Sequence, residues 1–329
     1  MQYGEVKGIG KPVSRLVQGT VMLSEADLPG SFALLDGVYA AGGRAFDTAY
    51  SYGGGEKERV LGAWLADRGV RDDLVILGKG AHPADGRPKV TPEDITSDLH
   101  ESLGRLGFDF IDLYVLHRDN PALPVGPLVE VLNEHHRAGK IGAFGGSNWS
   151  PERIGAANDY ARANGLLPFA VSSPNFSLAE QFRPPWPGCI SVSGPQGEVA
   201  RAWYREQGIP LFTWSSLAGG FFSGRFSRTN LDQFTAYLDR NCIEAYGEEP
   251  NFQRLDRARE LADERGLSIP QVALAYVLGQ PDHIYPLVGS SNAEEFQQNA
   301  AALDVNLTPQ ELAWLDLRSE TRESVVGSQ

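Results

Sequence analysis

The 329-residue sequence contains only two cysteines, Cys189 and Cys242, which lie far apart and without CxxC spacing. So sparse a pair excludes a disulfide framework or a zinc cluster and is typical of a reducing compartment. No stretch approaches the roughly 18 consecutive apolar residues that a membrane helix needs. Residues 1–10 lack the apolar core of a secretion signal. We therefore expect a soluble, cytoplasmic protein with no membrane partner.

Positive charge is scarce too, because the formal net charge is −13. Nucleic-acid binding depends on basic patches that neutralise phosphates, so we expect no nucleic-acid partner. A complete GxGxxG motif after a strand is also missing, since Gly8-Ile9-Gly10 has no third glycine, and this excludes a Rossmann dinucleotide site. Only one of the six histidines, His117, ends a predicted strand, so we expect no metal site. The sequence leaves the oligomeric state open.

What the sequence does contain is a regular alternation of short β-type runs with helix-type segments, which predicts a parallel sheet with helical crossovers. Eight such runs favour a closed barrel over an open sheet. We therefore predict the α/β class and a single (β/α)8 TIM barrel over residues 1–318, followed by a polar, loosely ordered tail at 319–329. The predicted strands are Leu16–Thr20, Gly43–Thr48, Leu74–Lys79, Phe110–His117, Ile141–Ser147, Pro168–Ser173, Ile209–Trp214 and Ile284–Gly289.

Several helix-type segments carry explicit start signals. Thr91-Pro92-Glu93-Asp94 has the pattern of a capping box with proline in the first turn, and Ser150, Ser268 and Thr308 begin similar patterns. Before the first strand, residues 3–13 are predicted to form a β-hairpin that closes the bottom of the barrel. The segments Phe182–Glu198 and Gly219–Phe252 exceed normal loop length, and we expect both as long functional loops on the C-terminal face.

Polar residues at the C-terminal ends of the predicted strands are the first candidates for catalysis, because these ends face the active site of a TIM barrel. Asp47 ends the second strand, Tyr52 follows it, Lys79 ends the third strand and His117 ends the fourth. Each residue alone has a structural explanation, as a loop cap, an interface aromatic, a solvated strand end or a core histidine. Their coincidence after three consecutive strands favours a functional site.

The chemistry of these four groups points to proton donation. A tyrosine with a free pKa of about 10 is protonated at neutral pH. A nearby lysine ammonium is expected to lower that pKa, an aspartate to hold the lysine, and a neutral histidine to orient a substrate oxygen. Such a set protonates an oxygen while a hydride attacks carbon, which is carbonyl reduction if a nicotinamide cofactor is bound.

Loops after strands seven and eight commonly bind phosphate in such barrels, and both loops here are rich in glycine and serine. Arg225 would supply a guanidinium for a pyrophosphate. The ends of strands five and six add candidates for the nicotinamide carboxamide, and Trp149 and Trp186 are candidates for a substrate pocket that suits sugar rings and aryl aldehydes alike. The cofactor candidates are Ser147, Asn148 and Ser173, then Ser215, Ser216, Leu217 and Gly219, then Gly289, Ser290, Ser291 and Asn292.

Three long stretches resemble the signatures of the aldo-keto reductase family, in the branch of bacterial general reductases and potassium-channel β subunits. They are FDTAYSYGGGEKERVLGAWL from Phe46 to Leu65, SLGRLGFDFIDLYVLH from Ser102 to His117, and GGSNW from Gly145 to Trp149. The resemblance covers nearly the whole chain. It implies that Asp47, Tyr52, Lys79 and His117 form the catalytic tetrad, with Tyr52 as general acid in reduction and general base in oxidation.

The resemblance also implies an extended NADPH or NADH across the barrel mouth, with Trp214 stacked on the nicotinamide and with Gln298 and Asn299 near the adenine end. Ser173 stands where many members have glutamine, so its contact with the carboxamide would be shorter or water-mediated. Trp214 replaces the usual tyrosine and should preserve stacking, because indole offers a larger ring face.

The residues expected to select the cofactor depart from the family pattern. Many members carry an arginine or lysine after strand eight for the 2′-phosphate of NADPH, whereas this chain has Glu294 and Glu295. A carboxylate there repels a 2′-phosphate by about 1 kcal/mol or more and can instead accept a hydrogen bond from a ribose hydroxyl. We therefore predict a reduced preference for NADPH, with NADH usable or favoured.

The predicted function is reduction of an aldehyde, ketone or ketosugar. Two alternatives stay open, an NAD-dependent sugar or alcohol dehydrogenase working mainly in the oxidative direction, and a cofactor-binding regulatory subunit.

Overall fold

The computed structural model describes residues 1–84 and 86–322. Eight parallel strands close into a barrel, in which each strand pairs with the next along the chain and β10 pairs back with β3. Each strand overlaps one predicted run, so the predicted TIM barrel is confirmed. The strands are β3 (Val17–Gly19), β4 (Ala45–Asp47), β5 (Val75–Gly80), β6 (Ile111–Leu116), β7 (Ile141–Ser147), β8 (Val171–Ser173), β9 (Leu211–Thr213) and β10 (Ile284–Val288).

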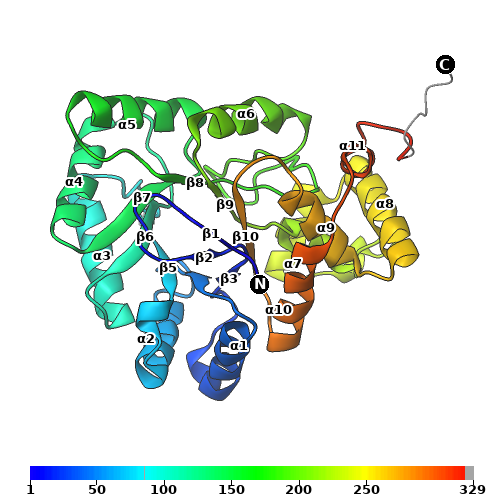
Figure 1. The fold of residues 1–329 in the computed structure, drawn as a ribbon, viewed down its shortest axis with the longest axis horizontal. Coiled ribbons are helices and arrows are strands. Elements are labelled where there is room, and N and C mark those ends of the chain that lie inside the picture. The colour runs from blue at the N-terminus through cyan, green and yellow to red at the C-terminus, as the bar shows by residue number, and fades with distance from the viewer. Residues whose placement is uncertain (85, 323–329) are drawn as a thin grey trace.

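Helices surround the barrel on the outside and connect its strands (Figure 1). Among the residues described, none of them combines the length and apolar character of a membrane span. The helices are α1 (Leu28–Ala40), α2 (Glu56–Arg68), α3 (Pro92–Leu106), α4 (Gly126–Arg137), α5 (Pro151–Ala163), α6 (Glu198–Gln207), α7 (Tyr237–Tyr246), α8 (Glu249–Arg265), α9 (Ile269–Leu278), α10 (Ala293–Ala300) and α11 (Pro309–Leu315).

The predicted helix starts are confirmed by their capping contacts. Thr91, Ser268 and Thr308 each begin a complete capping box, at α3, α9 and α11 respectively. At α5 the Ser150 hydroxyl accepts from the backbone N–H of Arg153. Each cap satisfies an amide that the first helical turn leaves without a partner, which is why these short sequence patterns fix where the helices begin.

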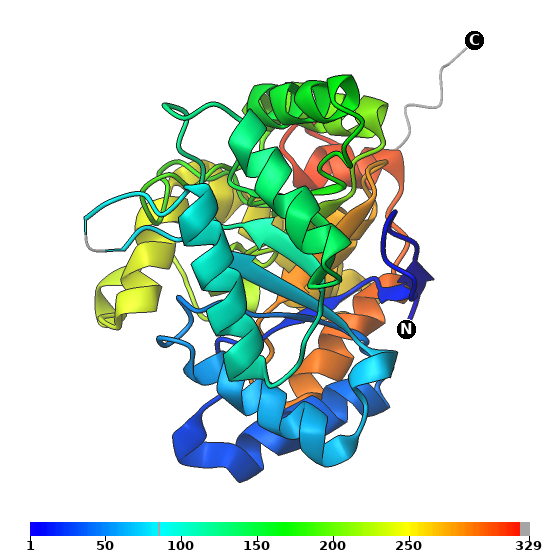
Figure 2. The same cartoon turned by 90° about the vertical axis from the view of Figure 1, so that its left-hand side faces the viewer.

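The apolar core has two layers. The outer layer lies between the strands and the helices, and the inner layer fills the barrel with side chains that alternate along the strands. The predicted hairpin pairs β1 (Tyr3–Gly4) with β2 (Val13–Ser14), and Val6 and Val13 belong to the inner layer. The hairpin therefore closes one end of the barrel, while α7 lies at the opposite end in Figure 2.

The two long segments after strands differ from each other. Residues 182–194 contain no helix or multi-residue strand, as predicted for a long loop. The segment Gly219–Phe252 was predicted as a second long loop, and this is wrong in part, because it contains α7 and the beginning of α8. Helix α7 buries Cys242, Ala245 and Tyr246 against the core. An amphipathic helix therefore forms much of this side of the C-terminal face.

Most of the predicted tail, at residues 323–329, lies outside the described residues. Of its first residues, Ser319 accepts a hydrogen bond from Arg257 Nη1 through its carbonyl (2.8 Å), and Arg322 forms an ion pair with Glu260 (3.0 Å). Both partners are on α8, so the chain continues along this helix up to residue 322.

Candidate active site

The four predicted catalytic residues come from three neighbouring strands. Asp47 is the last residue of β4, Lys79 lies one residue before the end of β5, and His117 follows β6 directly. Tyr52 is in the turn after β4. Because parallel strands β4, β5 and β6 are adjacent in the barrel, their C-terminal ends bring these residues to one place.

Asp47, Tyr52 and Lys79 contact one another in a triangle. The Lys79 ammonium forms an ion pair with the Asp47 carboxylate and also donates to the Tyr52 hydroxyl oxygen at 3.0 Å. The Tyr52 hydroxyl in turn donates to Asp47 Oδ2 at 3.1 Å. The phenol is thus held between the cation and the anion of a buried ion pair, which fixes the direction in which its oxygen points.

The electrostatics of Tyr52 differ from the sequence-based expectation. Lys79 was expected to lower the pKa of Tyr52, but burial first, and the neighbouring Asp47 carboxylate second, raise the pKa of Tyr52 well above its usual range. Burial also raises the pKa of Asp47 and lowers that of Lys79, and the contact between the two opposes both shifts. The resting site therefore holds Tyr52 in its protonated, acidic form.

His117 lies beside this triangle as a neutral imidazole. Its ring packs edge-on against Tyr52, with centroids 6.1 Å apart, and against His82 at 5.0 Å. Burial lowers the pKa of His117 well below its usual range, and the charges of Lys79 and Arg118 add to the effect. A neutral imidazole near the phenol can donate a hydrogen bond to a substrate oxygen without adding a positive charge beside the phenol.

The residues predicted to bind the nicotinamide carboxamide lie together at the ends of β7 and β8. Ser147 Oγ donates to the Ser173 carbonyl at 2.8 Å, and Asn148 Nδ2 donates to Ser147 Oγ at 3.2 Å. Within the described chain, the buried Ser173 hydroxyl oxygen has no hydrogen-bond partner. Since buried polar groups normally have partners, this hydroxyl is a ready contact for a polar ligand group such as a carboxamide.

The side-chain amide oxygen of Asn148 already accepts hydrogen bonds within the protein. Asn148 Oδ1 accepts from the Ile190 amide at 3.0 Å and from Trp214 Nε1 at 3.2 Å, and its backbone has a φ of 60°. Positive φ is uncommon outside glycine and is concentrated at functional sites. Ala81, Ser215 and Ala218, which follow β5 and β9, share this conformation. Strained backbone is thus concentrated at the C-terminal face of the barrel.

The predicted phosphate loops follow the neighbouring strands β9 and β10. Ser216 and Ser290 are fully buried, and their hydroxyls bond within the protein, to the Thr213 carbonyl and to Asn299 Nδ2 respectively. Ser291 is exposed, and both its amide and its hydroxyl donate to Glu295 Oε2. The remaining predicted residues of these loops, Leu217, Gly219, Gly289 and Asn292, lie beside them.

Two other predicted cofactor residues already have polar partners. Arg225 forms an ion pair with Asp239, and its guanidinium lies over the Phe226 ring. Gln298 Nε2 donates to Glu294 Oε1 at 3.3 Å on the exposed side of α10. A phosphate bound to Arg225 would therefore share this guanidinium with Asp239.

The two predicted pocket tryptophans have different environments. Trp186 is exposed near the mouth, with its ring 6.3 Å from that of Trp214, and its Nε1 donates to the Tyr237 hydroxyl. Trp149 is fully buried in the outer core layer and donates to the Arg118 carbonyl at 3.1 Å. Because it is fully buried, Trp149 is a core residue and does not line an open pocket, contrary to the prediction.

Some residues at the site escaped the sequence analysis. The buried hydroxyls of Thr20 and Thr48, just after β3 and β4, have no partner in the described part of the chain. Arg118 follows His117 and contacts the long loop after β8. Thr20 and Thr48 are the last residues of predicted strands and Arg118 directly follows one, and that position is the signal that could have identified them.

A polar site of this kind at the C-terminal end of a TIM barrel, with a phenol held by an ammonium, is typical of an oxidoreductase that protonates a substrate oxygen. A sequence model of the aldo/keto reductase family matches residues 15–318. The chain therefore belongs to the aldo/keto reductase family and is an oxidoreductase of that family.

Proteins similar to this chain have names that indicate different functions. The oxidoreductase YrpG of Bacillus subtilis is 27% identical, over 96% of this chain and 95% of its own length. A probable voltage-gated potassium channel subunit beta of Oryza sativa is 27% identical, over 94% of both chains. An aryl-alcohol dehydrogenase [NADP(+)] of Phanerodontia chrysosporium is 28% identical, over 88% of this chain and 76% of its own length. These relatives agree with the branch that the sequence motifs indicated.

Proposed function

We propose that this protein is a nicotinamide-dependent carbonyl reductase in which Tyr52 donates the proton to the carbonyl oxygen. The observation that carries the proposal is the position of the Tyr52 hydroxyl between Lys79 and Asp47. Ser147, Asn148 and Ser173 would hold the carboxamide, Trp214 the nicotinamide face, and the loops after β9 and β10 the phosphates. The bound cofactor supplies the hydride that attacks the carbonyl carbon.

The side chains around Tyr52 then divide the remaining work. His117 orients the carbonyl oxygen toward the phenol, and the Tyr52 hydroxyl breaks its O–H bond and transfers the proton to that oxygen. The resulting phenolate is stabilised by the Lys79 ammonium 3.0 Å away, while Asp47 keeps the ammonium in place. Since the raised pKa keeps Tyr52 protonated before the reaction, the lysine acts mainly on the state in which the proton has left.

The reaction predicts a specific loss in Tyr52→Phe. The variant should bind NADH as tightly as wild type but reduce aldehydes about 10²- to 10⁴-fold more slowly, which is the usual contribution of general acid catalysis. The loss of NADH absorbance measures turnover, and fluorescence titration measures cofactor binding. The control is Tyr50→Phe, which changes an exposed tyrosine of the same turn. Equal turnover in Tyr52→Phe and wild type would remove Tyr52 from the mechanism.

The residues around α10 support use of NADH. Between residues 266 and 317 the sequence contains no arginine or lysine, so this segment provides no cation for a 2′-phosphate. Glu295 accepts from the Ser291 amide and hydroxyl, which places a carboxylate against the loop after β10. We propose that the enzyme uses NADH at least as well as NADPH.

Exchange of Glu294 tests this cofactor preference. Wild type should have a kcat/KM for NADH equal to or above that for NADPH, and Glu294→Arg should raise the NADPH value by roughly two- to fivefold, as expected for an exposed ion pair. Glu294→Gln separates lost repulsion from gained attraction. Steady-state rates with both cofactors give the comparison. A strong preference of wild type for NADPH would contradict the proposal and would direct attention to Arg225.

The oxidative direction is a second candidate, because one relative is named an aryl-alcohol dehydrogenase. The same four residues serve both directions, with Tyr52 as the base in oxidation. Assays that start from alcohol and oxidised cofactor, and from carbonyl and reduced cofactor, distinguish the preferred direction.

A further inference from the structure

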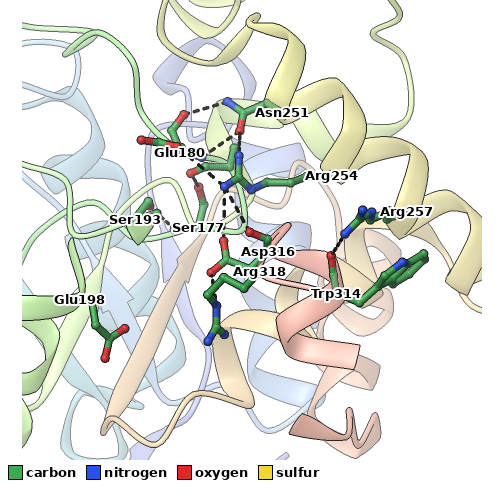
Figure 3. A network of polar contacts seen from close by, with 12 residues as sticks. Ser177, Glu180, Ser193, Glu198, Asn251, Arg254, Arg257, Trp314, Asp316 and Arg318 are labelled. Atoms are coloured by element: carbon green, nitrogen blue, oxygen red, sulfur yellow. Dashed lines mark hydrogen bonds and ion pairs between the residues drawn. The ribbon is translucent and has the colours of Figure 1, made fainter. Parts of the chain in front are cut away.

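Three arginines of the described chain are buried, and one of them has no acidic partner. Arg118, Arg201 and Arg254 have exposed fractions of 7%, 4% and 2%. Arg201 forms an ion pair with Glu198, and Arg254 lies 3.5 Å from Asp316 and 3.8 Å from Glu180 (Figure 3). Within residues 1–84 and 86–322, no carboxylate lies within 4.0 Å of the Arg118 guanidinium.

The partners that Arg118 does have are uncharged. Its Nε donates to the Pro187 carbonyl at 3.1 Å, Nη1 to the His117 carbonyl at 2.9 Å and Nη2 to Cys189 Sγ at 3.3 Å. The adjacent carboxylate, Asp119, is bonded to Arg153 instead, at 2.8 Å. A buried guanidinium that is hydrogen-bonded but not neutralised is costly, because taking a charge out of water is offset only by an opposite charge nearby.

Arg118 also keeps hydrogen-bond donors to spare. A guanidinium has five N–H groups, and the three bonds above use one on Nε, one on Nη1 and one on Nη2. One N–H on each terminal nitrogen is left over. A guanidinium with an N–H available on each terminal nitrogen can donate to two oxygens of a carboxylate or a phosphate.

The position of Arg118 places this cation at the reaction centre. It follows His117 directly, and its charge is close enough to act on Tyr52, His117 and Lys79. The long loop is shaped around it, because a Cβ on Gly188 would lie 3.3 Å from Arg118 Cδ, and Gly188 has a φ of +73°. Asp47, the carboxylate of the catalytic triangle, is already paired with Lys79.

We propose that Arg118 is a specificity-determining residue that binds an anionic group of the substrate, a carboxylate or a phosphate carried on the same molecule as the reacting carbonyl. The inference rests on the proposed carbonyl reductase function and names the substrate class for the same site. The anion supplies the missing counter-charge and orients the carbonyl toward Tyr52 and His117.

Matched pairs of substrates test this proposal. The pair 4-oxobutanoate and butanal differs by a carboxylate, and the pair glyceraldehyde 3-phosphate and glyceraldehyde differs by a phosphate. Wild type should have a kcat/KM about tenfold to hundredfold higher for the anionic member of at least one pair, as expected for charge-assisted hydrogen bonds. The pair with the larger ratio identifies the anion. A ratio near 1 in both pairs, with the neutral aldehydes turned over, would overturn this inference and leave the proposed function intact.

Variants of Arg118 test whether this residue is responsible. Arg118→Met should bring the anionic-to-neutral ratio close to 1, mainly through a higher KM for the anionic substrate. Arg118→Lys should give an intermediate ratio, because a lysine keeps the charge but not the two-pronged geometry. Arg183→Gln removes an exposed positive charge from the same loop and should leave the ratio as in wild type. An unchanged ratio in Arg118→Met would refute the assignment.

Binding of succinate, measured by calorimetry on the full-length protein with NADH bound, gives a readout that needs no turnover. Wild type should bind succinate or inorganic phosphate, and Arg118→Lys should bind it about tenfold more weakly. If no carbonyl is reduced but the anion binds through Arg118, the proposed function fails while the anion site stands. Absence of binding of both anions to wild type would overturn the anion site as well.

Discussion

Tyr52 has a pKa above its usual range and His117 has one below, and both shifts arise first from burial. For an acid that must be protonated and a hydrogen-bonding ring that must be neutral, both shifts act in the useful direction. The sequence could place these side chains, because each stands at a strand end. It could not predict the direction of the Tyr52 shift, because that depends on how closely distant segments pack around the hydroxyl.

These shifts predict the pH dependence of the reaction. Between pH 6.5 and 10.0, the ordinary pKa values of the two groups, neither Tyr52 nor His117 should change protonation. Neither group should therefore produce a step in the kcat/KM for carbonyl reduction within this window, as measured with saturating NADH. Alcohol oxidation needs the phenolate, so its kcat/KM should rise about tenfold per pH unit. His82→Gln is the control, because His82 is the nearest other imidazole. A step near pH 7 in reduction that His82→Gln retains would contradict this prediction.

At the scale of elements, the strands and most helices could be predicted from local patterns. Strands covered on both faces are apolar throughout, and capping residues mark helix starts, so neither depends on distant contacts. Helix α7 was missed for a physical reason. Its N-cap, Ala236, makes no side-chain capping bond, and the exposed Tyr237 and Leu238 in its first turn hide its amphipathic pattern. Its helical state depends on packing of Cys242 and Tyr246 against the barrel, which local sequence does not specify.

The start of α3 gives a prediction on stability at this scale. Arg87 first, and the Thr91 cap with it, lower the pKa of Asp94 to about 2. Because the pKa is lowered in the folded state, this stabilisation is present above the unfolded value of 3.8 and is lost as pH falls toward 2. Asp94→Asn should cost about 1 kcal/mol at pH 7, allowing for the exposure of Arg87 to solvent.

Urea unfolding of wild type and Asp94→Asn at several pH values checks this. The difference in the free energy of unfolding should shrink between about pH 4 and pH 2. Glu93→Gln, at an exposed carboxylate in the same turn, is the control and should show little difference at any pH. An undiminished difference in the free energy of unfolding between wild type and Asp94→Asn at pH 2 would contradict a stabilising role for the Asp94 charge.

At the scale of the whole molecule, the buried Arg254 joins three distant parts of the chain. From α8, its Nη1 donates to Asn251 Oδ1 at 3.2 Å, while Nη2 lies near Asp316 after α11 and Glu180 after β8 (Figure 3). Asn251 also bonds to the backbone of Glu180 in both directions. The end of the C-terminal helix and the segment just before the long loop are therefore both held to Arg254 and Asn251.

Substitution of Arg254 and substitution of Asp316 should lower the free energy of unfolding by unequal amounts. Asp316→Ala leaves a buried guanidinium without its nearest carboxylate and should cost about 3 kcal/mol. Arg254→Met should cost less, because Asp316 keeps its ion pair with Arg318 at 3.0 Å. Urea unfolding of both single variants and of the double variant measures the difference and the coupling. Equal losses in the free energy of unfolding for the two single variants would show that the unpaired charge of Arg254 does not cause the destabilisation.

The hairpin of β1 and β2 occupies one end of the barrel, and Tyr52 follows the C-terminal end of β4 at the opposite end. An affinity tag or a solid support attached through Met1 would consequently sit on the far side from the opening. In the immobilised protein the C-terminal face of the barrel would point toward the solvent, so the attachment would not hinder diffusion of substrate and product.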